Sequence, residues 1–423
     1  MQPGPDRALE LVALGIFALA LAHTFAAKQL ERLSRRFPRH AGLYHLLGEI
    51  EVVFGLWAIV LILAMVAMTG GAQALSYAES RNYTEPLFVF VVMVMAASRP
   101  ILATVIRSVD VIAGVLPVAR PVATAWLGLA AIPLLGSLVT EPAAMTIAAL
   151  TLAPSIFAPH IPERVKYMAL GVLFVNVSIG GTLTSYAAPP VLMVATPWQW
   201  DSAWMLSRFG WKAALAVLAN ATLATFVLRR HLMAAPPAPA AALDEARVPL
   251  LVVTVHVALL AVVVLLVHHP VAFLGLFLMF LGFTQAYERH QSPLILREAL
   301  LVAFFLAGLV VLGGMQRWWL QPIVSGLEPL ALFFGTLGLT AITDNAALTY
   351  LGSIVPGMSD DAKYMLVAGA VAGGGLTVIA NAPNPAGVAL LKRGFADETI
   401  GAVELLIGAA LPTAIAAAAF LWL

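Results

Sequence analysis

Two carboxylates stand in the middle of long apolar stretches of this chain, where a charge needs a chemical reason. Glu141 interrupts residues 121–158 and Asp344 interrupts residues 328–357, and both stretches are otherwise nearly free of charge. A charged side chain at the centre of a bilayer costs about 2.5 to 3.5 kcal/mol on insertion scales. A carboxylate can hold either a proton or a hard cation such as sodium. We therefore predict that Glu141 and Asp344 bind a cation and protons.

Neutral oxygens accompany the two acids. The further candidate ligands, with amide or hydroxyl oxygens, are Asn345, Asn381, Asn384, Thr140, Thr343, Thr184 and Ser185. The hypothesis places a sodium ion at Asp344, Asn345 and Glu141, with the other residues around it. The structural alternative is that the acids cap helix N-termini. In that alternative, the Asn, Ser and Thr side chains only satisfy backbone where helices break.

The composition places these residues in a membrane protein. Hydrophobic residues make up 61% of the 423-residue chain and charged residues 11%, whereas a soluble domain carries about 25% charged residues. Apolar runs of about 20 residues, the length of a transmembrane helix, recur from end to end. A net charge of +1 without a basic stripe gives no reason to expect a nucleic-acid partner. Zero cysteines exclude disulfides and thiolate metal sites.

Hydrophobic windows predict ten helical spans. They lie near residues 8–27, 50–69, 86–106, 164–196, 203–228, 249–267, 270–287, 298–315, 363–391 and 400–423. The stretches 121–158 and 328–357 differ, because each is broken in the middle and each half is shorter than a comfortable span. We interpret both as re-entrant hairpins, whose irregular backbone is tolerated at membrane depth only inside protein or beside water.

A repeat links the two hairpins. Residues 140–146 match residues 343–349 in residue type at almost every position. Downstream, the Lys-Tyr-Met triplets at 166–168 and 363–365 match, and a Gly-Gly pair and an Ala-Pro pair then follow in the same order. The distribution of Lys and Arg puts both termini outside the cytoplasm and makes the two repeats inverted. Inverted repeats with broken helices are the architecture of secondary transporters.

The predicted fold class is an all-α polytopic membrane protein with two inverted repeats, re-entrant hairpins and broken transmembrane helices. Its predicted parts are N-terminal scaffold helices (1–85), a first inverted repeat (86–231) with hairpin 121–158, a cytoplasmic linker (232–248), connecting scaffold helices (249–297) and a second inverted repeat (298–423) with hairpin 328–357.

The paired hairpins, the Asp344-Asn345 tip, the break at 381–385 and the run 300–314 resemble the ion-transporter superfamily. The closest resemblance is to its proposed sodium/proton antiporters, over residues 86–231 and 298–423. One departure is the first tip, which reads Glu-Pro where a tip with Asn is usual. The resemblance implies a secondary active transporter that exchanges sodium, or another monovalent cation, for protons.

The resemblance also implies a homodimer and an elevator-like motion of the hairpin domain against a scaffold. We expect an integral protein of the bacterial inner (cytoplasmic) membrane that needs no cofactor, with a small inorganic cation and protons as transported species. A sodium-coupled anion or carboxylate symporter of the same superfamily is the alternative, although two acidic tips argue against it. A remote alternative is an intramembrane enzyme, for which no water-activating His cluster, paired acid motif or Ser nucleophile is apparent.

Overall fold

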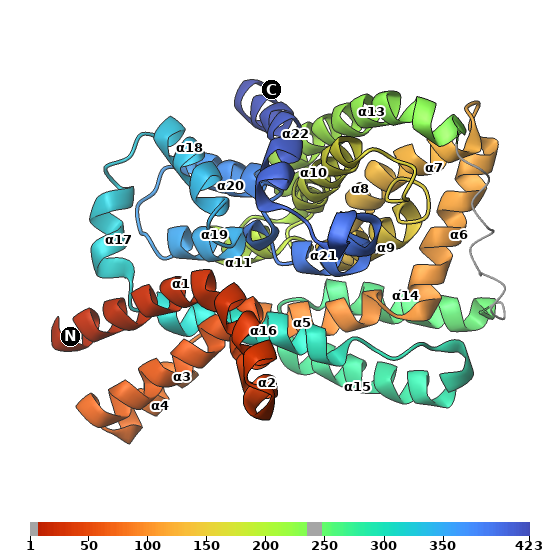
Figure 1. Cartoon of the computed structure of the whole chain (residues 1–423). Coiled ribbons are helices and arrows are strands. Elements are labelled where there is room, and N and C mark those ends of the chain that lie inside the picture. Colours follow the sequence, from red (N-terminus) through yellow and green to blue (C-terminus); the bar gives the residue numbers. More distant parts are fainter. Residues whose placement is uncertain (1–6, 235–247) are drawn as a thin grey trace.

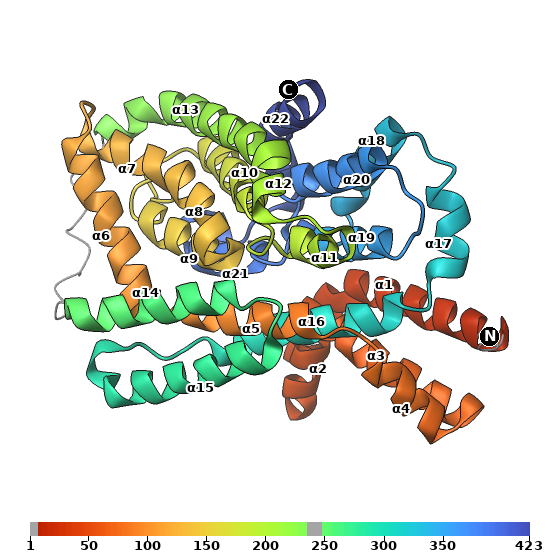
Figure 2. The ribbon, with the colours of Figure 1, turned by 180° about the vertical axis from the view of Figure 1, so that it is seen from behind.

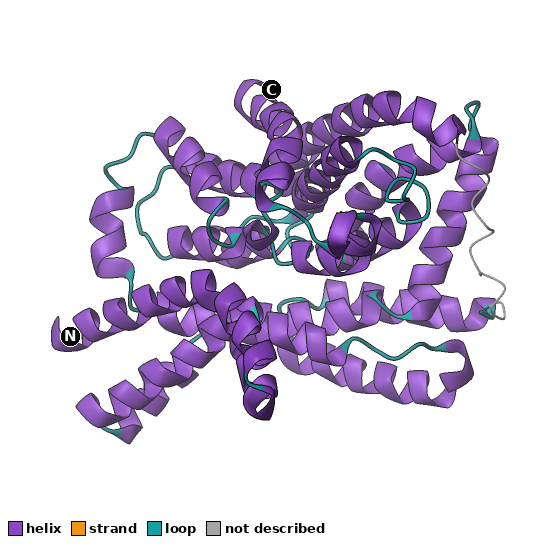
Figure 3. Ribbon diagram, viewed as in Figure 1, coloured by secondary structure: helices purple, strands orange, loops and turns teal. Residues whose placement is uncertain are grey.

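The structure is a computed structural model that describes residues 7–234 and 248–423. All regular secondary structure in this part of the chain is helical, which confirms the all-α prediction (Figure 3). Seven of these helices are long and apolar enough to cross a membrane, or eight spans if one bent pair counts as a single crossing. The helices lie in two layers, which both Figure 1 and Figure 2 show.

The lower layer of Figure 1 contains helices from the start and the middle of the chain. They are α1 (Arg7–Arg36), α2 (Ala41–Gly48), α3 (Ile50–Thr69), α4 (Gly71–Glu79), α5 (Thr84–Ala96), α14 (Leu250–Leu265), α15 (Pro270–Ala286) and α16 (Leu296–Gly313). Two helices climb to the upper layer at opposite edges: α6 (Arg99–Val115) and α17 (Arg317–Val324).

The upper layer contains both predicted hairpins. Its first group is α7 (Arg120–Leu129), α8 (Ala131–Val139), α9 (Glu141–Leu152), α10 (Glu163–Gly180), α11 (Pro189–Trp198), α12 (Ser202–Met205) and α13 (Trp211–Ala234). Its second group is α18 (Pro329–Thr340), α19 (Asn345–Ser353), α20 (Asp360–Gly373), α21 (Asn384–Leu391) and α22 (Ala402–Trp422). Each group runs in the order hairpin, broken helix, long helix. The inversion of one group relative to the other stays a prediction.

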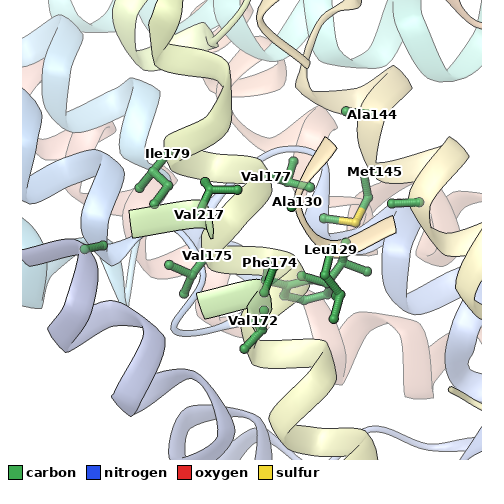
Figure 4. Close-up of a cluster of buried hydrophobic side chains, with 14 of the residues drawn as sticks. Leu129, Ala130, Ala144, Met145, Val172, Phe174, Val175, Val177, Ile179 and Val217 are labelled. Carbon is green, nitrogen blue, oxygen red and sulfur yellow. The ribbon is translucent and has the colours of Figure 1, made fainter. Parts of the chain in front are cut away.

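The core of the upper layer surrounds α10. Its fully buried Phe174 and Val175 pack with Leu129 of α7, Met145 of α9 and Val217 of α13 (Figure 4). In a bilayer, packing of this kind stabilises the helices through van der Waals contacts and not through exclusion of water. This packing holds the hairpin formed by α8 and α9 against α10 and so fixes where its tip lies.

Two buried asparagines tie four helices of the upper layer together. Asn176 of α10 donates from Nδ2 to the carbonyl of Leu129 at 2.8 Å and to that of Val217 at 3.3 Å. Asn220 of α13 donates to Asn176 Oδ1 at 2.9 Å and to the carbonyl of Pro412 in α22 at 3.3 Å. These bonds hold α7, α10, α13 and α22 together.

The two layers meet where the hairpins and a broken helix touch the lower layer. Ala143 of α9, Leu192 of α11, and Ala346 and Ala347 of α19 are buried in the lower-layer core. The hairpin helices α9 and α19 contribute only alanines to this buried contact, whereas α11 contributes the larger Leu192 and Met193. The tips with the candidate acids therefore lie at the boundary between the layers.

The predicted span 86–106 is wrong as a single helix. α5 ends at Ala96, α6 begins at Arg99, and the two helices are bent by 62°. Pro100 explains the break, because its ring would collide with the carbonyl of Ala96 and it has no N–H to donate to that carbonyl. The bend turns the chain from the lower layer to the upper one.

Other boundaries also differ. α1 continues to Arg36 instead of ending near 27, because Lys, Gln, Leu, Glu and Arg in this stretch are all strong helix formers. α13 continues to Ala234, so the start of the predicted linker 232–248 is helical, and residues 235–247 lie outside the described residues.

Both predicted hairpin turns are present, at Thr140 and at residues 341–344. The first arm is longer than predicted: α7 and α8 together, Arg120–Val139, form an apolar segment of 20 residues. The expectation that each half is too short to span is therefore wrong for this arm. Only one residue, Ala130, separates α7 from α8. The two helices therefore form one nearly continuous arm that is long enough to span a membrane by length and composition.

Candidate functional site

The first hairpin tip has a strained backbone. Thr140 lies between α8 and α9 with φ 82° and ψ 152°, a region that is essentially reserved for glycine and costs a β-branched residue about 1 to 3 kcal/mol. The Thr140 side chain is buried, and its Oγ1 has no hydrogen-bond partner. Strain of this kind persists only where the surrounding structure imposes it.

Glu141, the first residue of α9, is fully buried. Its Oε2 accepts a hydrogen bond from Asn381 Nδ2 at 2.8 Å, across 240 residues of sequence. Its Oε1 has no hydrogen-bond partner. A Cβ on Gly181 would lie 2.7 Å from Oε1, so only glycine allows the backbone to approach the carboxylate here. The first acid thus keeps one oxygen available at a tightly packed position.

Asp344 at the second tip caps its own helix. Its Oδ1 accepts from the backbone N–H groups of Ala346 at 2.8 Å and Ala347 at 3.2 Å. The residue is 8% exposed and lies close enough to Glu141 for the two carboxylates to interact electrostatically. The capping alternative considered for Asp344 is therefore present in the structure, and its carboxyl group still lies near that of Glu141.

The broken stretch between α20 and α21 contributes Asn381 and Asn384, and the start of α19 contributes Asn345. Asn384 Nδ2 donates to the carbonyls of Gly374 at 2.8 Å and Thr377 at 2.9 Å, which satisfies backbone that the break leaves open. Asn345 Nδ2 approaches Ser178 Oγ at 3.5 Å. All three residues are fully buried, and the Oδ1 atom of each lacks a hydrogen-bond partner.

The unpartnered oxygens form the most informative feature of the site. They are Thr140 Oγ1, Glu141 Oε1, Asn345 Oδ1, Asn381 Oδ1 and Asn384 Oδ1. Buried polar groups in proteins nearly always have a partner, so several unpartnered acceptors at neighbouring backbone breaks call for a bound species that attracts oxygens. A hard monovalent cation, or a proton on the carboxylate, provides that attraction.

Three of the predicted residues are committed elsewhere or contribute little. Thr184 Oγ1 donates to the carbonyl of Ser137 at 2.7 Å, and Ser185 Oγ pairs with Ser202 Oγ at 3.2 Å. Thr184 and Ser185 thus bond to the protein itself, as the structural alternative predicts for polar residues near a helix break. Thr343 is half-buried and its N–H continues the helical bonding of α18.

Sequence reasoning missed two residues beside the site. Ser178 of α10 donates from Oγ to the carbonyl of Val371 at 2.8 Å and so joins the two broken helices next to Asn345. Ser137 of α8 donates to the carbonyl of Gly180 at 2.6 Å and accepts from the N–H of Leu183 at 2.9 Å. The signal available in the sequence was position: Ser178 stands just before the glycine pair at the end of α10, and Ser137 stands just before the first hairpin tip.

Two comparisons with known proteins found a match. A family model described as "Putative Na+/H+ antiporter" matches residues 8–423. The chain belongs to this family. The crystal structure of the YdaH transporter of Alcanivorax borkumensis is similar at 14% sequence identity and a TM-score of 0.44, over 88% of this chain and 96% of that chain. No curated protein matches the chain.

Family membership and the apolar helices together establish an integral membrane transporter. The family implies a small cation as substrate. The described residues contain no group of three or more His, Cys, Asp and Glu side chains that could hold a metal ion. The oxygens at the tips are instead mostly neutral, with one carboxylate from each hairpin.

Proposed function

We propose that the chain is a secondary active transporter that exchanges sodium, or another monovalent cation, for protons across the membrane. The observation that carries the proposal is the set of unpartnered buried oxygens at the hairpin tips and at the break between α20 and α21. Such oxygens suit a cation that binds without fixed geometry, and the adjacent carboxylates suit a proton that competes with it.

In this proposal, Glu141 Oε1 and the Oδ1 atoms of Asn345 and Asn381 contact the cation. Asp344 keeps its capping bonds through Oδ1 and contributes charge. Protons arriving at the carboxylates cancel the charge that holds the cation, so cation and protons occupy the site in turn. Exchange follows because an empty site with two negative charges is costly to carry through the membrane.

The sodium-coupled anion symporter is less well supported. An anion needs donors, whereas the unpartnered atoms of the two tips are acceptor oxygens or a hydroxyl. A homodimer and an elevator-like movement of the upper layer against the lower layer belong to the proposal. The small residues Ala143, Ala346 and Ala347 at the boundary would offer little resistance to such sliding.

Exchange in proteoliposomes tests the proposal. The purified protein is reconstituted with a pH-sensitive dye inside, and sodium, lithium, potassium or carboxylate salts are added outside. We expect sodium or another monovalent cation to drive proton efflux, and protein-free liposomes to show none. Uptake of a labelled carboxylate that depends on sodium, with no cation-driven proton movement, would contradict the antiport proposal and support the symporter.

A further inference from the structure

An apolar groove of about 400 Å³ lies away from the candidate site, where the turn between α6 and α7 meets α13. Figure 1 places these elements at one edge of the upper layer. Val118 in the turn is 53% exposed and Phe226 on α13 is 60% exposed, and both line the groove. In a membrane protein such an exposed apolar face contacts lipid.

One wall of the groove covers a buried polar atom that has no hydrogen-bond partner. Thr225 of α13 lines the groove and is 5% exposed, and its Oγ1 forms no hydrogen bond. The neighbouring polar group is already satisfied, because Trp126 Nε1 of α7 donates to Thr222 Oγ1 at 3.1 Å. The Thr225 hydroxyl lies beneath the surface of the groove, so the groove itself offers apolar contacts to whatever fills it.

A positive charge stands one helical turn beyond this hydroxyl. Arg229 lines the groove, and its guanidinium lies 4.0 Å above the ring of Phe226. It forms no ion pair with any described residue, whereas Arg120 at the start of α7 is neutralised by Asp110 at 2.6 Å. The groove thus has an apolar wall that ends, along α13, at a cation without an ion-pair partner among the described residues.

We propose that the groove binds one anionic phospholipid. One acyl chain lies along the apolar wall beside Trp126, and the phosphate pairs with Arg229. Zwitterionic lipids share the chains and the ester but carry no net charge. The proposal therefore predicts selectivity for the anionic headgroup, and it is independent of which ion the transporter exchanges.

Quenching of Trp126 fluorescence tests the proposal directly. The full chain is reconstituted in vesicles in which phosphatidylglycerol or phosphatidylcholine with brominated acyl chains replaces part of the lipid. The Trp126 signal is the difference between the wild type and Trp126→Phe. We expect half-maximal quenching at an about fivefold lower fraction of brominated phosphatidylglycerol than of phosphatidylcholine. This ratio corresponds to the attraction between one arginine and an anionic lipid.

Two variants assign the selectivity. Arg229→Gln should remove the preference, whereas Arg230→Gln, the adjacent exposed arginine that does not line the groove, should keep most of it. Equal quenching of the wild type by both lipids would overturn the proposal in favour of unselective boundary lipid. Absence of quenching by either would mean that protein covers the groove, which also overturns it.

Discussion

The two hairpin tips carry an acid at matching positions of the sequence repeat but use it differently. Asp344 stands before its helix and accepts from two backbone N–H groups of α19. Glu141 is the first residue of α9, caps nothing with its side chain, and reaches Asn381 instead. Thr140 before it adopts a strained conformation, whereas Thr343 continues α18 without positive φ.

The difference shows that the position of the Asp344 carboxylate is fixed by its own helix. The position of the Glu141 carboxylate is fixed by contacts with other segments of the upper layer. A capping carboxylate keeps its position wherever α19 goes. The Glu141 carboxylate depends on Asn381 and on the close approach of Gly181, so its surroundings change if these segments shift. We therefore expect Asp344 to keep its position in the site, and Glu141 to be the carboxylate whose contacts change with occupancy.

The largest effect is expected for Asp344→Asn. Asn caps helices about as well as Asp, so the fold should persist, while loss of the charge should slow exchange about 100-fold or more, since removing one partner of a buried charge pair costs about 3 to 5 kcal/mol. Proteoliposome exchange and the melting temperature in detergent check both parts. Asp344→Ser, which also caps, is the matched control and should fail equally. Near-normal exchange in either variant would make Asp344 a cap alone.

Glu141→Gln should reduce exchange about 10- to 100-fold, because a hydrogen bond or contact that involves a charged group is worth about 1.5 to 3 kcal/mol. If both acids exchange their protons for one sodium ion, the wild type moves one net charge per cycle, worth about 2.3 kcal/mol per 100 mV. A potassium-diffusion potential should then drive sodium in the wild type with equal pH and sodium on both sides.

The exchange that remains in the Glu141→Gln variant should not depend on the membrane potential. A wild type whose sodium distribution stays flat under voltage, while a pH gradient still moves sodium, would show that Asp344 alone carries the exchange. In that case only the second tip would exchange protons, and Glu141 would stay protonated throughout the cycle.

Asn381→Ala should raise the sodium concentration for half-maximal exchange about tenfold, because Glu141 loses a charge-assisted hydrogen bond and the cation loses an amide oxygen. The maximal rate should change less. Asn384→Ala is the comparison variant: it loses two bonds to carbonyls of the break, so it should mainly lower the melting temperature. Equal shifts in sodium dependence for both variants would contradict a specific role for Asn381.

The smallest effect separates the two threonines. Thr140→Gly should raise the free energy of unfolding by about 1 kcal/mol, because glycine adopts the observed conformation without strain. Thr343→Gly should lower it by about 0.5 to 1 kcal/mol, because there glycine only adds freedom to the unfolded chain. Thermal unfolding in detergent measures both. The same sign for both substitutions would mean that the tips do not differ in backbone strain.

Much of the fold follows from local sequence signals. The spans near 249–267, 270–287 and 298–315 correspond closely to α14, α15 and α16, because each is a continuous apolar run bounded by polar residues or proline. The break before Pro100 was also predictable locally, because a proline cannot form the helical hydrogen bond to the carbonyl four residues before it. A search for apolar windows does not detect this break.

The site could be predicted only in part. Polar residues inside apolar runs identified Glu141, Asp344 and the asparagines, because burial of such groups needs a reason. Which of them touch depends on tertiary packing: nothing near Glu141 in the sequence indicates a bond to Asn381, 240 residues away. The positive φ of Thr140 was equally hidden, because a threonine gives no sign of a conformation that it disfavours.

The asparagine network of the upper layer has a consequence for biogenesis. Asn220 donates to the carbonyl of Pro412, 192 residues later in the chain, and Gly171 of α10 lies against the backbone of Gly408 in α22. A nascent chain therefore inserts α10 and α13 long before their partner leaves the ribosome. Until then, amide groups that end up buried face lipid or a chaperone. Insertion and assembly are thus separate events for this protein, and the interval between them is when membrane quality control can act on it.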